Sequence, residues 1–145
     1  MMDINEFLTT IKDKGALTWG PSNTRAIEHA NSTLQTKKCA MLPNFIIELY
    51  TKTAGINLGS GYIFGPTELP NGKNFPIPSI TKINDEIRNI PALKNKTVFG
   101  RNDLFWFAFD AFGICYTLNN TNGMALRKYD DPYRALYDCL MGGKI

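Results

Sequence analysis

The chain has 145 residues, 43% of them apolar and 20% charged, and a formal net charge of +3. This length suffices for one domain with one hydrophobic core, and the composition is ordinary for a globular protein, which excludes disordered and fibrous classes. The lysines and arginines are scattered and never gather five in one segment. We therefore predict a solvated surface and no direct binding of nucleic acid.

The sequence also indicates a compartment. The sequence contains no run of about 18 apolar residues, so no membrane span is predicted. The opening "MMDINEFLTTIKDKG" lacks the basic and apolar regions of a signal peptide. The three cysteines, Cys39, Cys115 and Cys139, are far apart and odd in number. They are more typical of buried thiols in a reducing cytoplasm than of a disulfide framework, so we predict a cytoplasmic protein.

Two helices are predicted at the start of the chain. Asp3 can cap the first, with Glu6 completing a capping box, and Gly15 ends it. A loop around Trp19 follows, and Ser22 or Asn23 can begin the second helix. The apolar stripes of the two helices are Ile4, Phe7, Leu8 and Ile11, and Ile27, Ala30 and Leu34.

The middle of the chain alternates between helices and irregular segments. A helix is predicted over residues 43–55, because Pro43 suits a first turn and Gly55 a C-terminal stop. Residues 61–65, "GYIFG", indicate a short strand, and residues 66–78 form a proline-rich segment outside regular structure. Ser79 can cap the next helix, which Pro91 ends, and its stripe is Ile80, Ile83, Ile87 and Ile90.

After Pro91 the apolar period changes to two, which predicts strands. The runs are residues 97–100, 104–110, 114–118 and 124–129, parted by turns at 101–103, 111–113 and 119–123. Asp130 or Asp131 and Pro132 open a last helix, closed at 142–143. Sequential strands with short turns form antiparallel sheets. We therefore predict a single α+β domain over residues 1–145, with an antiparallel sheet of about five strands packed with N-terminal, middle and C-terminal helices.

The run "NDLFWFAFDAFG" is rich in aromatic residues, and both faces of its strand are apolar. Alternation separates Phe105, Phe107 and Phe109 from Leu104, Trp106 and Ala108. A strand of this kind must be covered on both sides, and the proline-rich segment is a candidate for the second cover. We predict that these rings belong to the core; a ligand groove is the alternative.

No catalytic, metal-binding or cofactor-binding constellation is predicted. Asp103 and Asp110 would lie roughly 23 Å apart on a straight strand, which exceeds the 9.5 Å or so at which two carboxylates flank a glycosidic bond, so each is expected to serve a turn. His29 has no cysteine at zinc-ligand spacing. The segment "NLGSGYIFG" precedes a strand and departs from the phosphate-loop pattern, which indicates a turn.

Several motifs together resemble the SUKH superfamily, which includes the fungal cell-wall-assembly-regulator (Smi/Knr-type) domains. The first is "MLPNFIIELYTKTAGINLGSGYIFG", in which a Leu-Pro dipeptide opens a helix and an aromatic-Gly strand follows. The second is "KTVFGRNDLFWFAFD", similar to the family's paired-strand unit, and the third is "DDPYRALYDCLMGG", similar to its closing helix. The resemblance runs from residue 27 onward. Residues 1–21 would then be an N-terminal helical addition and loop, and the turn at 101–103 is poorer in glycine than in many members.

The resemblance implies a non-enzymatic protein-binding domain. Many bacterial members are immunity proteins that neutralise polymorphic or contact-delivered toxins by masking the active site, and fungal members are regulatory scaffolds. We therefore expect a toxin domain as the partner, with a regulatory adaptor as the first alternative. A small ligand-binding protein or enzyme that uses the aromatic sheet face is the second. The family has no universal catalytic residues to carry over, and its partner-facing surface varies.

Overall fold

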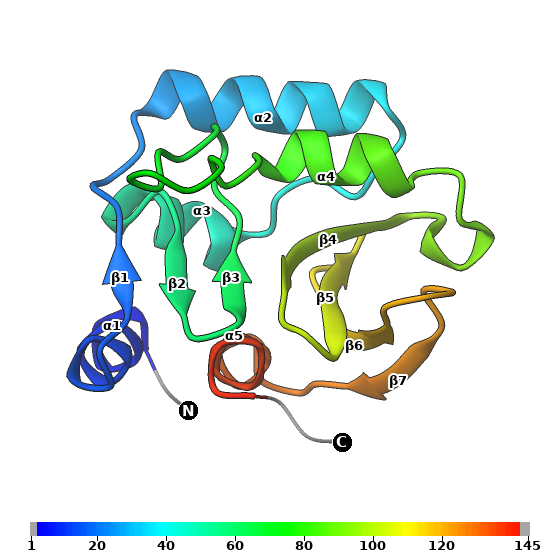
Figure 1. Cartoon of the computed structure of the whole chain (residues 1–145). Helices are drawn as coiled ribbons and strands as arrows, with labels where there is room; N and C mark the ends of the chain where they lie inside the picture. The colour runs from blue at the N-terminus through cyan, green and yellow to red at the C-terminus, as the bar shows by residue number, and fades with distance from the viewer. Residues whose placement is uncertain (1–2, 143–145) are drawn as a thin grey trace.

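Seven strands form one antiparallel sheet, and each strand pairs with its neighbours along the chain, in the order β1 to β7. The computed structural model describes residues 3–142 (Figure 1). The strands are β1 (Leu17–Thr18), β2 (Ile56–Leu58), β3 (Gly61–Ile63), β4 (Lys96–Arg101), β5 (Phe105–Asp110), β6 (Cys115–Asn119) and β7 (Ala125–Lys128). The helices are α1 (Ile4–Asp13), α2 (Thr24–Thr36), α3 (Asn44–Lys52), α4 (Ile80–Ile87) and α5 (Pro132–Leu140), with a 3-10 turn η1 (Pro91–Leu93).

The α+β class and the antiparallel sheet are confirmed, but the sheet has seven strands instead of about five. The two additional strands are β1, which falls in the predicted loop around Trp19, and β2, which precedes the predicted strand at 61–65. They contain two and three residues, too few for an alternating pattern to emerge. Pairing holds them in place, since Leu17 lies opposite Asn57 and Ile56 opposite Ile63.

The helix starts follow the predicted caps. The side chains of Asp3, Asn23 and Ser79 accept hydrogen bonds from backbone N–H groups three residues further on, which satisfies donors that the first helical turn leaves free. Helix α4 ends at Ile87, earlier than predicted, and Pro91 begins η1 instead of stopping α4. At the last helix, Gly142 has a left-handed φ of +76°, and Gly143 lies outside the described residues.

The N-terminal segment is built into the fold. Helix α1 packs on α5, where the Phe7 ring lies 5.2 Å from the Tyr137 ring in an edge-to-face arrangement, and β1 adds a strand to the sheet. Residues from all five helices and from β2 to β6 share one hydrophobic core. Nothing in the packing therefore separates residues 3–21 from the rest of the domain.

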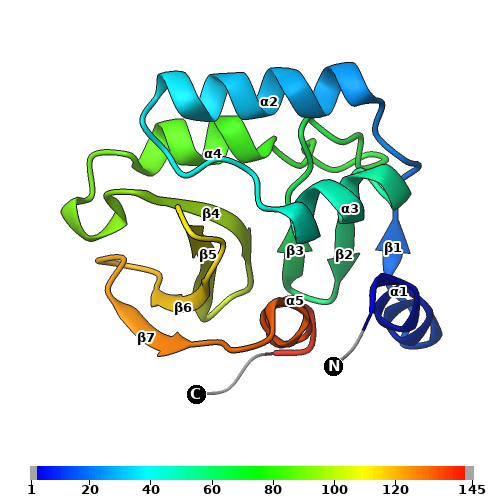
Figure 2. The same ribbon diagram turned by 180° about the vertical axis from the view of Figure 1, so that it is seen from behind.

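Helices α3 and α5 cover one side of the sheet. Helix α5 packs against β3, β4, β5 and β6, and α3 lies behind β2 and β3 in Figure 1 and in front of them in Figure 2. The contact with α5 requires glycine at one position in each of two strands. A Cβ added to Gly61 would lie 2.5 Å from the Cys139 carbonyl oxygen, and a Cβ added to Gly100 would lie 2.9 Å from the Cys139 sulfur. Helices α2 and α4 lie side by side along the sheet's upper edge in Figure 1.

The middle of the aromatic strand belongs to the core, as predicted, whereas Leu104 is 54% exposed and Trp106 is half-buried. Phe107, Ala108 and Phe109 are fully buried, so the middle of β5 is covered on both faces. The proline-rich segment lies beside β2 and β3, not over β5: an added Cβ on Gly55 would lie 2.3 Å from the Leu69 side chain, and the Trp19 indole donates a hydrogen bond to the Pro70 carbonyl. The proline-rich segment is therefore not the second cover of β5, contrary to the prediction.

Candidate functional site

One face of the sheet presents a row of side chains that points away from α3 and α5. Tyr62 on β3 lies opposite Arg101 on β4, and Arg101 lies opposite Trp106 on β5. Directly opposed residues in an antiparallel sheet project to the same face. Ile56 and Ile63, which project to the other face, are buried. Gly61 and Gly100 face α5 and directly precede Tyr62 and Arg101 in the chain, so the row projects to the opposite face of the sheet.

The three side chains of this row remain accessible. Tyr62 and Trp106 are half-buried, and Arg101 is exposed. The Arg101 guanidinium lies 5.6 Å from the centre of the buried Phe64 ring, a cation–π arrangement that restrains the charged group over an aromatic surface. The row thus places the Arg101 cation on β4 between two partly exposed rings, Tyr62 on β3 and Trp106 on β5.

The proline-rich segment borders this row and forms a hollow with it. A cavity of about 480 Å³ is lined by Tyr62, Phe75 and Arg101 together with Phe64, Asn71, Asn74, Pro76, Ile77 and Pro78. The Phe75 side chain is 93% exposed. Among the described residues that line the hollow, Arg101 alone carries a charge. We call the set Tyr62, Phe75, Arg101 and Trp106 the aromatic–arginine surface.

Of the two carboxylates singled out in the sequence, Asp103 precedes β5 and Asp110 is its last residue, so they lie at opposite ends of the strand and do not meet. Asp110 accepts hydrogen bonds from the N–H groups of Phe112 and Ile114, which confirms its role in a turn. Asp103 instead accepts from the Ser60 hydroxyl at 3.1 Å. The turn before β5 is organised by Asn102, whose side-chain oxygen accepts from the next N–H groups at 104 and 105.

The cysteines and the histidine are spread over the fold. Cys115 and Cys139 are buried, and Cys39 is half-buried; burial raises the pKa of all three thiols above its ordinary value, so each is protonated at neutral pH. His29 is exposed on α2. Within residues 3–142, no cluster of three or more histidine, cysteine or acidic side chains could hold a metal ion.

The structure also bears on the predicted glycine turn and on the prediction of no membrane span. The glycine-rich segment forms the β2–β3 hairpin, with Gly59 in the left-handed region at φ +57°, so it is a turn as predicted. None of the helices in the described part of the chain has both the length and the apolar character needed to cross a bilayer.

Sequence reasoning missed the aromatic–arginine surface. Its members lie on three strands and one loop, and only the strand register brings them together. One local signal exists: in "NGKNFPIP" a large ring stands in a proline-rich loop with no apolar period to bury it. No such signal marks Tyr62 or Arg101.

The chain matches no protein-family model and no curated protein. The resemblance to the SUKH superfamily therefore rests on the sequence motifs and stays a prediction.

Proposed function

We propose that this chain is a non-catalytic protein-binding domain of SUKH type, an immunity protein that neutralises a polymorphic or contact-delivered toxin by masking its active site. The observation that carries the proposal is the aromatic–arginine surface. Tyrosine, tryptophan and arginine are the residues most enriched among those that dominate binding energy at protein interfaces. Here they lie side by side on a sheet face, next to an exposed phenylalanine.

The chemistry of this surface suits a protein partner. Its rings bury a large apolar area for little loss of side-chain entropy, and Arg101 can pair with a carboxylate of the partner through two hydrogen bonds. The Phe64 ring beneath Arg101 reduces the freedom that Arg101 would lose on binding. Binding alone would be the mechanism, because a bound sheet face blocks substrate access to whatever active site it covers.

The packing of β5 weighs against an active site or ligand groove in the middle of the aromatic strand, between Phe107 and Phe109. Such a groove would need rings that open to solvent beside polar groups. Phe107, Ala108 and Phe109 instead have no exposed surface. The three cysteines, which form no disulfide, support placement in a reducing compartment, and we propose the cytoplasm.

Affinity capture tests the proposal. The tagged chain would be used to retain partners from a lysate of its own host, and the retained protein would then be expressed in a sensitive strain with and without the chain. We expect a stoichiometric partner with a toxin domain, and restored growth on co-expression. A retained regulatory or cell-wall protein would favour the adaptor function instead. A toxin partner whose effect persists on co-expression would contradict neutralisation.

A further inference from the structure

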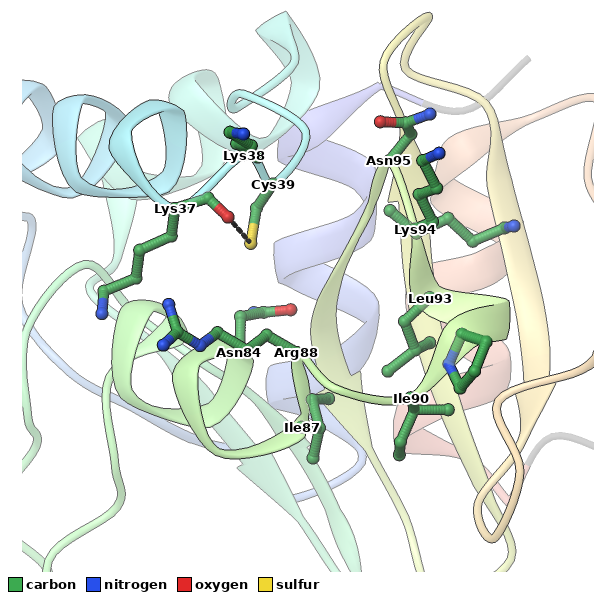
Figure 3. A pocket seen from close by; sticks show the side chains of 12 residues that line it. Lys37, Lys38, Cys39, Asn84, Ile87, Arg88, Ile90, Leu93, Lys94 and Asn95 are labelled. Carbon is green, nitrogen blue, oxygen red and sulfur yellow. Dashed lines mark hydrogen bonds between the residues drawn. The ribbon is translucent and has the colours of Figure 1, made fainter.

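The fold gathers basic residues that are scattered along the sequence. A cavity of about 400 Å³ lies between the end of α2, helix α4 and the segment from Ile90 to Lys96 (Figure 3). Five basic residues and no acidic residue stand among the described side chains that line it: Lys37, Lys38, Arg88, Lys94 and Lys96. These five residues come from two segments of the chain, 37–38 and 88–96, which the fold brings to one cavity.

The same cavity has an apolar wall. Ile87, Ile90, Pro91 and Leu93 line it; Leu93 is buried, and Ile87 and Ile90 are half-buried. In Figure 3 the Cys39 sulfur points toward the open space from the opposite side. Because burial raises the pKa of this thiol, Cys39 contributes a neutral surface. A ligand with an apolar body would therefore meet apolar atoms on both sides.

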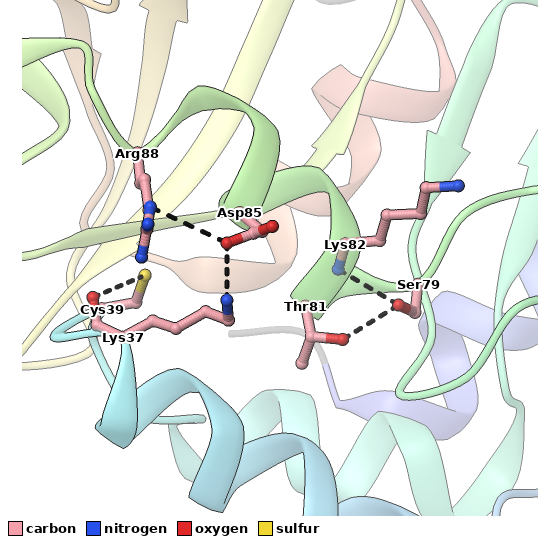
Figure 4. Close-up of polar contacts among 7 residues, drawn as sticks. All are labelled: Lys37, Cys39, Ser79, Thr81, Lys82, Asp85 and Arg88. Carbon is pink, nitrogen blue, oxygen red and sulfur yellow. Dashed lines mark hydrogen bonds and ion pairs between the residues drawn. The ribbon is translucent and has the colours of Figure 1, made fainter.

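Three of the five cations already have partners within the protein. The Asp85 carboxylate, just outside the cavity, accepts a hydrogen bond from the Lys37 ammonium and lies 3.8 Å from the Arg88 Nε (Figure 4). The Lys96 ammonium donates to the Ala92 carbonyl and lies 5.5 Å from the Tyr116 ring centre.

Asp85 neutralises one charge, so the cavity keeps a positive excess. Lys38, Arg88 and Lys94 are exposed at its mouth. The Arg88 side chain is 52% exposed, so its planar donor group is accessible to an anion.

The backbone is unusual at two points of the rim. Lys38 and Asn95 have φ angles of +61° and +63°, and within residues 3–142 they are the only residues other than glycine in the left-handed region. Both line this cavity, one at the end of α2 and one before β4. Such conformations cost free energy and cluster at binding sites. The cavity therefore coincides with the two places where the chain adopts a costly backbone conformation.

We propose that this cavity binds a small organic phosphate, a molecule with an apolar ring or chain and one phosphomonoester group. The apolar body would lie against Ile87, Ile90 and Leu93, and the phosphate would lie at the mouth, where Arg88 can donate two hydrogen bonds and Lys38 and Lys94 supply charge. The volume falls within the usual range for small-molecule sites. The site is separate from the aromatic–arginine surface, with which it shares no lining residue.

Nuclear magnetic resonance titration of the whole chain tests this proposal with three probes. Phenyl phosphate has both features of the ligand, inorganic phosphate has only the charge, and phenol has only the ring. We expect phenyl phosphate to shift the amide signals of residues 37–39, 87–88 and 93–96 and to bind at least about tenfold more tightly than either partial probe, since ring burial and charge pairing both contribute. Equal binding of phenol, or shifts spread over the whole surface, would overturn the proposal.

A matched pair of arginine variants locates the phosphate. Arg88→Ala removes the donor at the mouth, whereas Arg25→Ala removes an exposed arginine near the start of α2 that does not line the cavity. We expect Arg88→Ala to weaken phenyl phosphate binding about tenfold, the usual effect of losing a hydrogen bond to a charged group, and Arg25→Ala to leave it unchanged. Equal affinities of the two variants would refute the assigned position of the phosphate.

Discussion

At the scale of single residues, the Asn84 side chain makes the hydrogen bonds to β4 that a longer β3 would otherwise make. Strand β3 pairs with β4 only at Gly100 and Arg101, and a bulge interrupts β4 between Val98 and Gly100. Beyond β3, the buried Asn84 side chain accepts from the Val98 N–H and donates to the Val98 carbonyl, both at 2.8 Å. It also donates to the Ile80 carbonyl, so a single amide joins α4 to the sheet.

Asn84→Ala should therefore be costly. The substitution leaves the N–H and the carbonyl of Val98 buried without partners, and each such group costs about 1–3 kcal/mol. We expect the free energy of unfolding to fall by about 2–4 kcal/mol, measured by urea denaturation. Asn89→Ala, at an exposed position two residues past the end of α4, is the control and should stay within about 0.5 kcal/mol. Similar losses in both variants would refute the bridging role.

The sequence does not reveal this role, because its cause lies outside the helix. The isoleucine stripe predicts α4, and Asn84 follows the buried Ile83 directly, where any polar residue would be read as facing solvent. The Val98 backbone groups need a partner only because β3 is short and β4 contains a bulge. A pattern within one helix carries no information about backbone groups of Val98, 14 residues away, that lack a strand partner on one side.

At the scale of elements, the predictions succeeded where several residues repeat one signal. Caps at Asp3 and Ser79 marked helix starts, and the period of two marked β4 to β7. Where an element is too short to repeat a signal, tertiary pairing decides instead. Strand β1, with two residues, exists because Leu17 and Thr18 lie opposite β2.

Phe107→Ala tests the place of β5 in the core. The ring is fully buried on a strand that α5 covers, so its removal leaves a cavity as well as a lost apolar contact. We expect a loss of about 3–5 kcal/mol in the free energy of unfolding, measured by chemical denaturation. Phe112→Ala is the matched control, since that ring is 87% exposed in the turn after β5, and it should change stability by less than about 0.5 kcal/mol. A small effect of Phe107→Ala would contradict the assignment of β5 to the core.

At the scale of the whole molecule, buried hydroxyl and thiol groups should set an alkaline limit to stability. Burial raises the pKa of Tyr129 from 10.0 to about 12, and the neighbouring Asp138 carboxylate, which accepts its hydrogen bond at 2.7 Å, acts in the same direction. A raised pKa in the folded state means that the contribution to stability is complete below pH 10 and is lost between pH 10 and about pH 12. Burial raises the pKa of Cys115 and Cys139 as well, from 9.0.

We therefore expect the urea midpoint of unfolding to fall as the pH rises above about 9, and to fall less steeply between pH 10 and 12 in Tyr129→Phe. Fluorescence-detected urea titrations at several pH values measure both curves. A midpoint that stays constant from pH 8 to 11.5 would contradict the buried, protonated state of these groups. Parallel curves for the two proteins would show that Tyr129 does not contribute.

The aromatic–arginine surface, the proposed binding surface, depends on the arrangement of the whole sheet. The sequence predicts the aromatic strand and the burial of its middle, whereas the half-buried rings of Tyr62 and Trp106 flank Arg101 only because of the strand register. A register depends on the turns, the bulge and the packing of the whole sheet. For the same reason, basic residues between positions 37 and 96 surround one cavity although the sequence scatters them.

The most direct test of the proposed function is a calorimetric titration of the captured partner domain with the wild-type chain, Arg101→Ala and Arg25→Ala. Both arginines are exposed, so neither change should unfold the domain, and thermal melting verifies this. If the aromatic–arginine surface masks the partner, the wild-type chain and Arg25→Ala bind one to one with equal affinity, and Arg101→Ala binds at least about tenfold more weakly. If Arg101→Ala binds as tightly as the wild-type chain, the sheet face is not the binding surface.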